Sequence, residues 1–276
     1  RSFNLKIKLK KINNANEVQF CFSDYFPIYN IGKIINYKLS KPKKQNSKFI
    51  IESIKTSFDM VCSNQAIGMI TLPVCKKTLK EYGFKFNGQT EFIGELSRQK
   101  IDRSSNEIMI LSTIKPEDKG KNLVVGLATT HIPLNKIFKE LNYTILQQKI
   151  VSFNDSLKKI WKIKKPLIGV TAINPHSGEG GIIGNEEEKL ISPLIKKLKS
   201  QKLQLEGPLS SDSCFYKLAR EKYDGIFCFY HDQALIPVKT LDFFNSINVT
   251  GGIPILRLSP DHGPAFDIAK KKYCKN

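Results

Sequence analysis

The hydrophobic and polar positions of this chain alternate, from about residue 66 onward, between short apolar runs and longer amphipathic segments. Short apolar runs bounded by turn residues are typical of buried strands. Their alternation with amphipathic segments is typical of βαβ units. The pattern therefore predicts an α/β fold with a mostly parallel sheet. The expected strands are residues 66–72, 107–112, 123–129, 167–173, 225–230 and 253–258.

One helix is predicted to begin near Asn185. Asn185 can act as an N-cap, and Glu188 follows three positions later, as in a capping box. Apolar residues then recur on one helical face, and lysines gather in the last turns. Pro193 falls inside this pattern, so we expect a kink or a division into two short helices.

Length and composition limit the class of protein. The chain has 276 residues, of which 41% are hydrophobic, so it can bury a large core as one α/β domain or as two lobes. No apolar run approaches the length that a membrane-spanning helix needs, and no secretory signal opens the chain. The six cysteines form no CxxC pair, which is typical of reduced thiols. These features predict a soluble cytoplasmic protein.

The formal net charge of +19 raises the alternative of a nucleic-acid-binding protein. Lysines, however, occur in nearly every segment, without a basic stripe, interleaved aromatics or a zinc-finger or RNP-type motif. A compositional bias explains this distribution more simply, although a modest positive field would help to capture a phosphorylated substrate. A basic nucleic-acid-binding or non-catalytic protein stays open as the alternative from a different class.

Three of the four histidines share one position relative to the predicted strands. His131 ends LVVGLATTH, His176 ends LIGVTAINPH and His231 ends GIFCFYH. Each follows the carboxyl end of an apolar strand, which is where ligands bind in open α/β sheets. Three imidazoles gathered there would form an open metal site. A histidine after a strand is more commonly a loop residue or a hydrogen-bonded cap, so the residues alone leave both interpretations open.

Residues 174–187 form a glycine-rich loop around His176. Glycines let the backbone approach a ligand closely, and the loop leads into the predicted helix, so its amides could meet an anion. Its spacing is not the dinucleotide-binding fingerprint, and no GK[ST] follows as in a P-loop. A purely structural turn is the alternative.

Arg257 stands in an otherwise apolar predicted strand. An unpaired charge there would be costly, and a buried arginine commonly meets a carboxylate or a phosphate. An internal ion pair is the alternative. Further polar residues gather in the same block, residues 230–263: His231, Asp232, Lys239, Asn248, Asp261 and His262.

With these residues in view, the chain resembles the PdxA family, the 4-hydroxythreonine-4-phosphate dehydrogenases of pyridoxal phosphate (vitamin B6) biosynthesis. The resemblance covers about residue 65 to residue 270. It rests on the ordered motifs ITLPVCKKTL, GQTEFIGEL, LATTHIPL, INPHSGEGGIIGNEE, GPLSSDS, YDGIFCFYHDQALIPVK, INVTGGIPILRLSPDHG and AFDIA. It implies a homodimer with the two-lobed α/β/α fold of isocitrate and isopropylmalate dehydrogenases, and an active site in the cleft between the lobes.

The resemblance also implies the division of the chain and the roles of its residues. Residues 1–88 and 251–276 would form lobe 1 with the cofactor loop, and residues 89–250 lobe 2 with the metal ligands and the dimerisation surface. His131, His176 and His231 match the metal ligands, one of which comes from the partner chain in family dimers. The substrate-binding matches are Gln89, Thr90, Lys239, Asn248 and Arg257. The cofactor-loop matches are His262, Gly263 and Ala265.

The implied reaction is the oxidation of 4-phosphohydroxy-L-threonine by NAD to a β-keto acid, which loses CO2 to give 3-amino-2-oxopropyl phosphate. A divalent metal would activate the alcohol. Zinc suits three imidazoles, with magnesium, manganese or cobalt as alternatives, and NADP is the alternative to NAD. Lys239 and Asp232 are the candidates for the group that removes the alcohol proton. A sister dehydrogenase of 4-phospho-D-threonate, 4-phosphoerythronate or a dihydrodiol carboxylate is the alternative function.

The sequence departs from the family pattern at several positions. Gln89 stands where the family has histidine, and Pro264 where it has threonine. Glutamine can donate a hydrogen bond but carries no charge, which keeps the sister substrates open. The glycine-rich N-terminal segment of the family is not found, and the chain begins with Arg1 and ends in KKKYCKN. We therefore expect a sequence truncated at both ends, and a fragment that folds without turnover is a further alternative.

Overall fold

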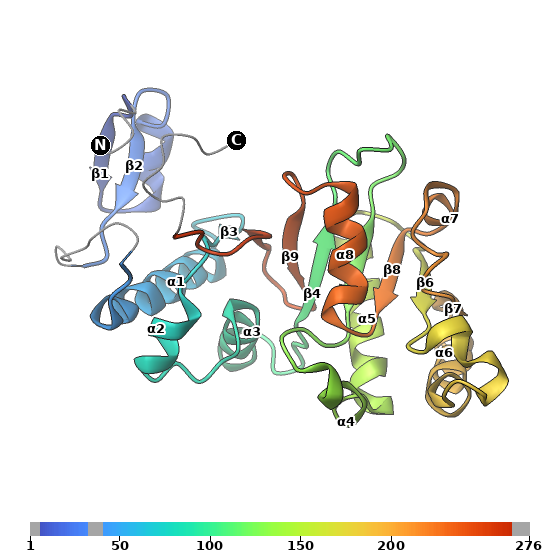
Figure 1. Ribbon diagram of the computed structural model, residues 1–276. Helices are drawn as coiled ribbons and strands as arrows, with labels where there is room; N and C mark the ends of the chain where they lie inside the picture. The colour runs from blue at the N-terminus through green and yellow to red at the C-terminus, as the bar shows by residue number, and fades with distance from the viewer. Residues whose placement is uncertain (1–5, 33–40, 267–276) are drawn as a thin grey trace. The chain divides into compact units, whose positions relative to one another are not determined.

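A computed structural model describes residues 6–32 and 41–266 of the chain (Figure 1). The chain is divided into two compact units. The first comprises residues 1–88 and 262–276, and the second comprises residues 89–261. Residues 251–261, which we expected in lobe 1, belong to the second unit because strand β10 pairs with strand β9 of that unit. The roles of the two units as cofactor lobe and metal lobe stay a prediction.

The first unit combines a small parallel strand pair with a helical segment. Its elements in chain order are β1 (Leu9–Ile12), a 3-10 helix (Ala15–Phe20), β2 (Phe26–Tyr29), a 3-10 turn (Lys44–Asn46), α1 (Ser47–Cys62), β3 (Met69–Ile70) and α2 (Lys76–Glu81). Helix α1 buries Ile54 and Phe58 on its apolar face. At its start, the Ser47 hydroxyl donates a hydrogen bond to the Thr78 carbonyl at 3.1 Å, which fixes α1 against α2.

The second unit is built on one sheet, whose strands lie in the order β10-β9-β4-β5-β8-β6-β7. The strands are β4 (Ile108–Ser112), β5 (Val124–Leu127), β6 (Leu167–Thr171), β7 (Gln204–Leu209), β8 (Gly225–Cys228), β9 (Ile247–Gly251) and β10 (Arg257–Pro260). Strands β5, β8, β6 and β7 run parallel to one another, whereas β4, β9 and β10 are joined by antiparallel pairings. The predicted α/β class is confirmed, and its parallel half contains the strands that precede the three histidines.

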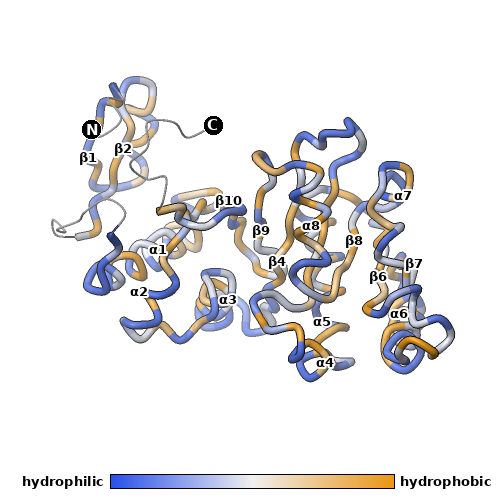
Figure 2. Tube along the Cα trace, viewed as in Figure 1, coloured by the Kyte–Doolittle hydropathy of each residue, from blue (hydrophilic) through white to orange (hydrophobic). Residues whose placement is uncertain are grey.

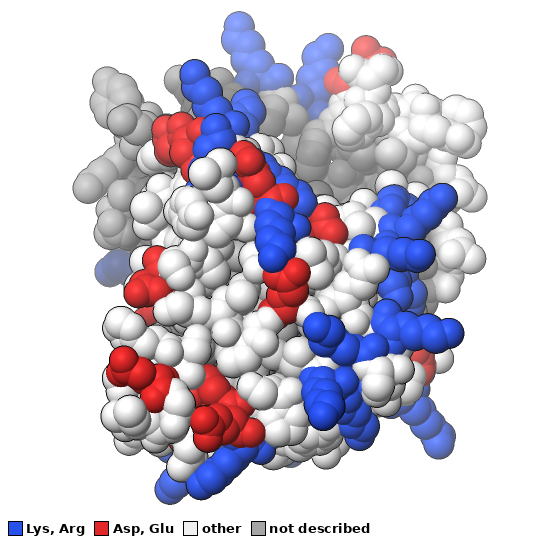
Figure 3. Space-filling model, turned by 90° about the vertical axis from the view of Figure 1, so that its right-hand side faces the viewer, with Lys and Arg blue, Asp and Glu red and all other residues white. Residues whose placement is uncertain are grey.

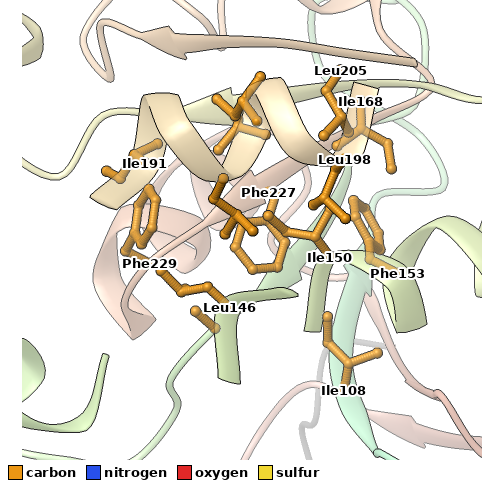
Figure 4. Packing of buried hydrophobic residues seen from close by; sticks show 14 of the residues in the cluster. Ile108, Leu146, Ile150, Phe153, Ile168, Ile191, Leu198, Leu205, Phe227 and Phe229 are labelled. Atoms are coloured by element: carbon orange, nitrogen blue, oxygen red, sulfur yellow. The ribbon is translucent and has the colours of Figure 1, made fainter. Parts of the chain in front are cut away.

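Helices cover both faces of this sheet. The helices of the unit are α3 (Gln89–Lys100), α4 (Ile137–Glu140), α5 (Tyr143–Lys159), α6 (Ser192–Ser200), α7 (Lys217–Lys222) and α8 (His231–Leu241), and α5, α6 and α8 pack on the sheet. Helices α5 and α6 pack on one face in a large apolar cluster (Figure 4), while α8 packs Ala234 and Val238 into a second cluster on the other face. The central strands are correspondingly hydrophobic in Figure 2.

Helix α5 lies close to the sheet because two strand glycines make room for Phe153. A Cβ added at Gly126 of β5 or at Gly225 of β8 would lie 2.7 or 2.6 Å from the Phe153 ring. The ring is fully buried. Close packing of this kind holds β5 and β8 in a fixed relation, which matters because two of the candidate ligands follow these strands.

The predicted helix near Asn185 takes a more complex form. Residues Glu187–Ile191 form a π-helical turn and α6 follows at Ser192, with Pro193 in its first turn. The backbone stays right-handed helical through Ile191 and Ser192, so the expected kink takes the form of a change from π-helical to α-helical winding beside the proline. The predicted cap at Asn185 is not observed, since Glu186 stands at the N-cap without a capping side-chain hydrogen bond. The pattern missed β7 and β9, whose sequences QLEGPL and INVTG lack a continuous apolar run.

No helix in the described part of the chain has the length and apolar character to cross a membrane. The five cysteines within the described ranges are free thiols. Figure 3 shows acidic side chains among the basic ones on the face that it presents, so the positive charge does not form one uninterrupted patch there.

Candidate active site

The three predicted metal ligands follow three neighbouring strands of the sheet. Strands β5, β8 and β6 are adjacent and parallel, so their carboxyl ends meet at the same edge. His131 follows β5 and His231 follows β8, and their ring centroids lie 5.5 Å apart. The Thr129 hydroxyl donates to the Phe229 carbonyl at 2.7 Å, which ties the two strand extensions together. Two of the three predicted ligands thus lie side by side.

His231 begins helix α8, and its neighbour sets its orientation. Nδ1 of His231 lies 2.7 Å from a carboxylate oxygen of Asp232. A carboxylate can only accept, so this contact holds the proton on Nδ1 and leaves Nε2 with its lone pair available. Nε2 is then the atom of His231 that could bind a metal.

His176 is carried on a loop of unusual conformation. From His176 to Gly180 every residue has positive φ, at 51°, 55°, 78°, 44° and 65°. L-residues adopt this region rarely, and glycine is favoured there. The loop therefore winds with a left-handed sense and leaves His176 exposed.

The three histidines do not form one site within a single chain. Among the described residues there is no group of three His, Cys, Asp or Glu side chains that could hold a metal ion. His131 and His231 are paired, whereas His176 stands on the exposed left-handed turn that follows β6. A site that forms only between two chains stays a prediction.

The paired imidazoles suit a metal of the zinc type as a partial donor set. Zinc–imidazole bonds are about 2.0–2.1 Å long, so two rings that share one ion have centres several ångströms apart, as His131 and His231 have. Structural zinc needs four ligands and catalytic zinc three from protein. These two histidines therefore fit such an ion but require a further ligand.

The glycine-rich loop does meet an anion, but the anion is the protein's own Glu187. This carboxylate is 2% exposed and accepts the backbone N–H groups of Ile173 and Asn174, both at 2.8 Å. Asn174 Nδ2 donates to its other oxygen at 2.9 Å. Burial alone would raise the pKa of Glu187, but these hydrogen bonds outweigh it and lower the pKa. Glu187 therefore anchors the start of the loop that carries His176.

Arg257 forms the centre of a second group of polar residues in the same unit. It is 2% exposed, and its guanidinium donates to Thr250 Oγ1 at 3.0 Å and to Thr90 Oγ1 at 3.4 Å. In the β9–β10 register Arg257 lies opposite Thr250 and Ser259 opposite Asn248. Opposed residues point to the same face of a sheet, as do residues two apart. Asn248 therefore shares a face with Arg257, and three predicted substrate residues come together.

Burial makes the charged form of Arg257 less favourable than it is in water. Burial lowers the pKa of its guanidinium to about 10, and the nearby Glu91 carboxylate opposes this shift. Glu91 lies one residue after Thr90 in the first turn of α3, and its other contact is with the Thr130 hydroxyl at 3.4 Å. Our reading of the sequence missed Glu91, although it stands inside the GQTEFIGEL motif.

Lys239 lies in the last turn of α8 and its ammonium is surrounded by acceptors. It donates to Ser246 Oγ and to the Asp261 carbonyl, both at 2.8 Å, and lies 3.0 Å from an Asp261 carboxylate oxygen. An ammonium has three donors and no acceptor. The three donors of Lys239 therefore meet acceptors within the unit, one of them the Asp261 carboxylate.

The remaining predicted residues occupy two places. Gln89 begins helix α3 beside Thr90. His262, Gly263 and Ala265 lie in an exposed loop that belongs to the first unit. In this loop Nδ1 of His262 lies 2.9 Å from the Gly263 carbonyl oxygen, and Ala265 has a φ of 46°. Residues 267–269 of the AFDIA motif lie outside the described residues.

A cavity of about 450 Å³ opens beside the histidine edge, and Asp212 lines it. The same cavity is lined by Tyr230 and Asp232, which flank His231. A hydrogen bond from Ser210 lowers the pKa of Asp212, and the nearby His176 contributes to the lowering. Asp212 was missed as a site residue. Its motif, GPLSSDS, was recognised, but only the fold brings it near His176.

Fold and site together define a class: an α/β protein of two units, with paired imidazoles at the carboxyl edge of its sheet and a buried arginine in the same unit. Comparison with known proteins agrees with this class. The family described as pyridoxal phosphate biosynthetic protein PdxA matches residues 1–276. The chain belongs to the PdxA family.

Individual relatives support the same conclusion. A protein of Caulobacter vibrioides named 4-hydroxythreonine-4-phosphate dehydrogenase is 36% identical over 264 residues, covering 95% of this chain and 77% of that protein. The crystal structure of 4-hydroxythreonine-4-phosphate dehydrogenase from Klebsiella pneumoniae is similar with a TM-score of 0.82 and 27% identity, over 99% of this chain and 79% of that one. A terephthalate 1,2-cis-dihydrodiol dehydrogenase from Burkholderia xenovorans shares the fold, with a TM-score of 0.61 and 20% identity over 90% of this chain and 76% of that one.

Proposed function

We propose that this chain is a dehydrogenase that oxidises 4-phosphohydroxy-L-threonine with NAD in pyridoxal phosphate biosynthesis. Membership of the PdxA family and the names of its relatives support this reaction. The observation that carries it is the pairing of His131 and His231 at 5.5 Å on the edge of a sheet whose unit also holds Arg257. Paired imidazoles suit a metal that activates an alcohol, and a buried arginine suits an anionic substrate.

The anion-binding group would orient the substrate. Arg257 offers a cation backed by Thr90 and Thr250, and Asn248 presents a buried amide oxygen on the same face, without a hydrogen-bond partner among the described residues. Lys239 and Gln89 complete the proposed set. Fixed donors of this kind reduce the entropy lost when substrate and cofactor are aligned. The substrate's phosphate and carboxylate would be held by charge and the reacting hydroxyl presented to the histidine edge.

The third metal ligand would be His176 of the partner subunit. Three imidazoles would then hold a divalent cation, zinc being the first choice for nitrogen donors. The chemistry that such a cation supplies when bound is Lewis-acid activation of the substrate hydroxyl. Large exposed apolar residues support a homodimer: Tyr216, Leu218, Ile236, Phe243 and Phe244 are each at least 60% exposed. Where such side chains form one contiguous patch, they mark a protein–protein contact surface.

Two residues compete for the proton of the alcohol. Asp232 has a carboxylate that is 62% exposed, and one of its oxygens is engaged by His231. Lys239 donates to Ser246 and to the Asp261 carbonyl, and it is paired with the Asp261 carboxylate. We therefore favour Asp232, acting beside His231, as the acceptor. The nicotinamide cofactor supplies the hydride acceptor and would bind the loop of His262, Gly263 and Ala265. The enzyme would work in the cytoplasm, where free thiols such as those of its described cysteines persist.

The assay is the formation of NADH by purified protein with 4-phosphohydroxy-L-threonine, in the presence of Zn²⁺, Mn²⁺ or Co²⁺ and after treatment with chelator. We expect turnover that is lost with chelator and restored by metal, and slower turnover of 4-phospho-D-threonate and 4-phosphoerythronate at equal concentration. Faster turnover of either sister substrate would reassign the enzyme to that substrate. Absence of turnover with all of them, together with salt-sensitive binding of DNA or RNA, would replace the proposal with the nucleic-acid alternative.

A further inference from the structure

One buried side chain, Gln233, connects the segments that carry the candidate ligands. It lies in the first turns of α8, two residues after His231, and is 7% exposed. Its Oε1 accepts the backbone N–H of Phe229 at 2.7 Å and lies 3.1 Å from the Thr171 hydroxyl. Its Nε2 donates to the Ala172 carbonyl at 2.7 Å and to Ser211 Oγ at 2.8 Å. One amide thus has four polar partners, of which Thr171 shares its hydroxyl proton with the Phe227 carbonyl.

The orientation of this amide is fixed by its partners. The Phe229 N–H can only donate and the Ala172 carbonyl can only accept, so the oxygen and nitrogen of Gln233 cannot exchange places. A buried polar atom left without a partner is unfavourable, so the arrangement that satisfies this amide is the stable one. The side chain therefore favours one arrangement of the backbone segments around it.

Each partner of Gln233 lies just before a candidate site residue. Phe229 precedes His231 by two residues. Its carbonyl also accepts a hydrogen bond from the hydroxyl of Thr129, and Thr129 precedes His131 by two residues. Ala172 follows the last residue of β6 and leads into the loop of His176. Ser211 precedes Asp212 and also donates to the Ala172 carbonyl, at 3.0 Å. Gln233 thus bonds the backbone just beyond β8 to the backbone just beyond β6.

We infer that Gln233 is a positioning residue that sets the spacing of the strand ends carrying His131, His176 and His231. It contacts none of the reacting groups in this assignment. Its effect is to hold the backbone from which the imidazoles extend, as outer-shell residues do at metal sites. The metal-binding part of the inference rests on the proposed function, whereas the positioning of the histidines does not.

The test compares Gln233→Met with the wild-type dimer. Methionine fills a similar volume but makes none of these hydrogen bonds. We expect Co²⁺ affinity, measured by competition with a chelating dye, to fall about 10- to 100-fold, and the Co²⁺ absorption band to change shape. In the metal-free protein, labelled histidine Cε1–H signals in NMR spectra should shift for His131, His176 and His231 and stay in place for His262.

Thr113→Val is the matched control. Thr113 is fully buried and its hydroxyl accepts the Leu123 N–H at 2.8 Å, at the start of β5, away from the histidine edge. It should lower the midpoint of thermal unfolding without changing Co²⁺ affinity or histidine signals. Gln233→Glu keeps the shape and the acceptor for Phe229 but places its second oxygen against the Ala172 carbonyl. Ser211→Ala removes a single partner of the amide. Both serve if the methionine variant does not fold, and both should shift the same histidine signals, Ser211→Ala by less.

Unchanged histidine signals in folded Gln233 variants would overturn the inference. Equal Co²⁺ affinity in Gln233→Met and wild type would overturn it as well. If the wild type itself binds no metal, the proposed function fails while the NMR comparison still decides whether Gln233 positions the histidines.

Discussion

Replacing His231 with alanine should abolish metal-dependent turnover, lowering kcat/KM by about 10³-fold or more. His231 supplies one of the two imidazoles that are already paired within one chain, at 5.5 Å from His131. With this ligand lost, the subunit supplies only His131 to its own site, so the site binds the proposed cation more weakly and no longer sets its coordination geometry. The measurements are metal content after dialysis and NADH formation with 4-phosphohydroxy-L-threonine.

The matched variant is His231→Cys, because a thiolate also binds zinc. It should retain metal at a higher level than His231→Ala while its turnover falls, and both variants should unfold with midpoints near that of the wild type because His231 is partly exposed. Full metal content and full turnover in His231→Ala would remove this histidine from the site.

Replacing Arg257 with methionine should raise KM for the phosphorylated substrate by about 10- to 100-fold, as expected when a charge-assisted hydrogen bond worth about 1.5–3 kcal/mol is lost. The guanidinium is buried, and Thr90 and Thr250 hold it in place. Burial lowers the pKa of Arg257 to about 10, so it remains charged at neutral pH and loses its proton only as the pH rises through that value. The KM of the wild type should therefore increase as the pH is raised beyond 9 to 10. The KM of the methionine variant should not show this increase.

Arg220→Met provides the control. Arg220 is equally buried, but it pairs with Asp118 and donates to the Lys121 carbonyl at 2.9 Å, in contacts that serve the fold. This variant should lower the free energy of unfolding and leave KM unchanged. If Arg220→Met and Arg257→Met raise KM equally, the effect belongs to stability and Arg257 does not bind the substrate.

Much of the fold could be predicted because the buried strands are continuous apolar runs in the sequence. Residues 107–112, 123–129, 167–173 and 225–230 contain β4, β5, β6 and β8, which are buried on both faces. The predicted strand at residues 253–258 overlaps only the first residues of β10, because strand pairing begins at Arg257. Pro254, which lies earlier, has no N–H to donate to a neighbouring strand. Strand β7 was missed because its sequence, QLEGPL, mixes polar and apolar residues. Such a mixture is expected of a strand at the edge of the described sheet, where β7 lies.

The candidate site likewise contains residues that the sequence could predict and residues that it could not. The strand-end position of His131 and His231 follows from topology alone, since parallel neighbours end at one edge. Gln233, Glu187 and Asp212 could not be assigned, because their roles depend on hydrogen bonds between segments far apart in sequence. The anion expected at the glycine-rich loop could not be identified as Glu187 without the π-helical turn that brings this carboxylate back to the loop.

A mixed-dimer experiment tests the central claim, a metal site completed by a second subunit. His176→Ala and His231→Ala are each expected to be inactive as homodimers. When the two are unfolded and refolded together, a mixed dimer contains one site with every histidine intact and one with two missing. About one quarter of wild-type activity should return if dimers form at random. No recovery in a sample shown to contain mixed dimers, or full activity in His176→Ala alone, would contradict the shared site.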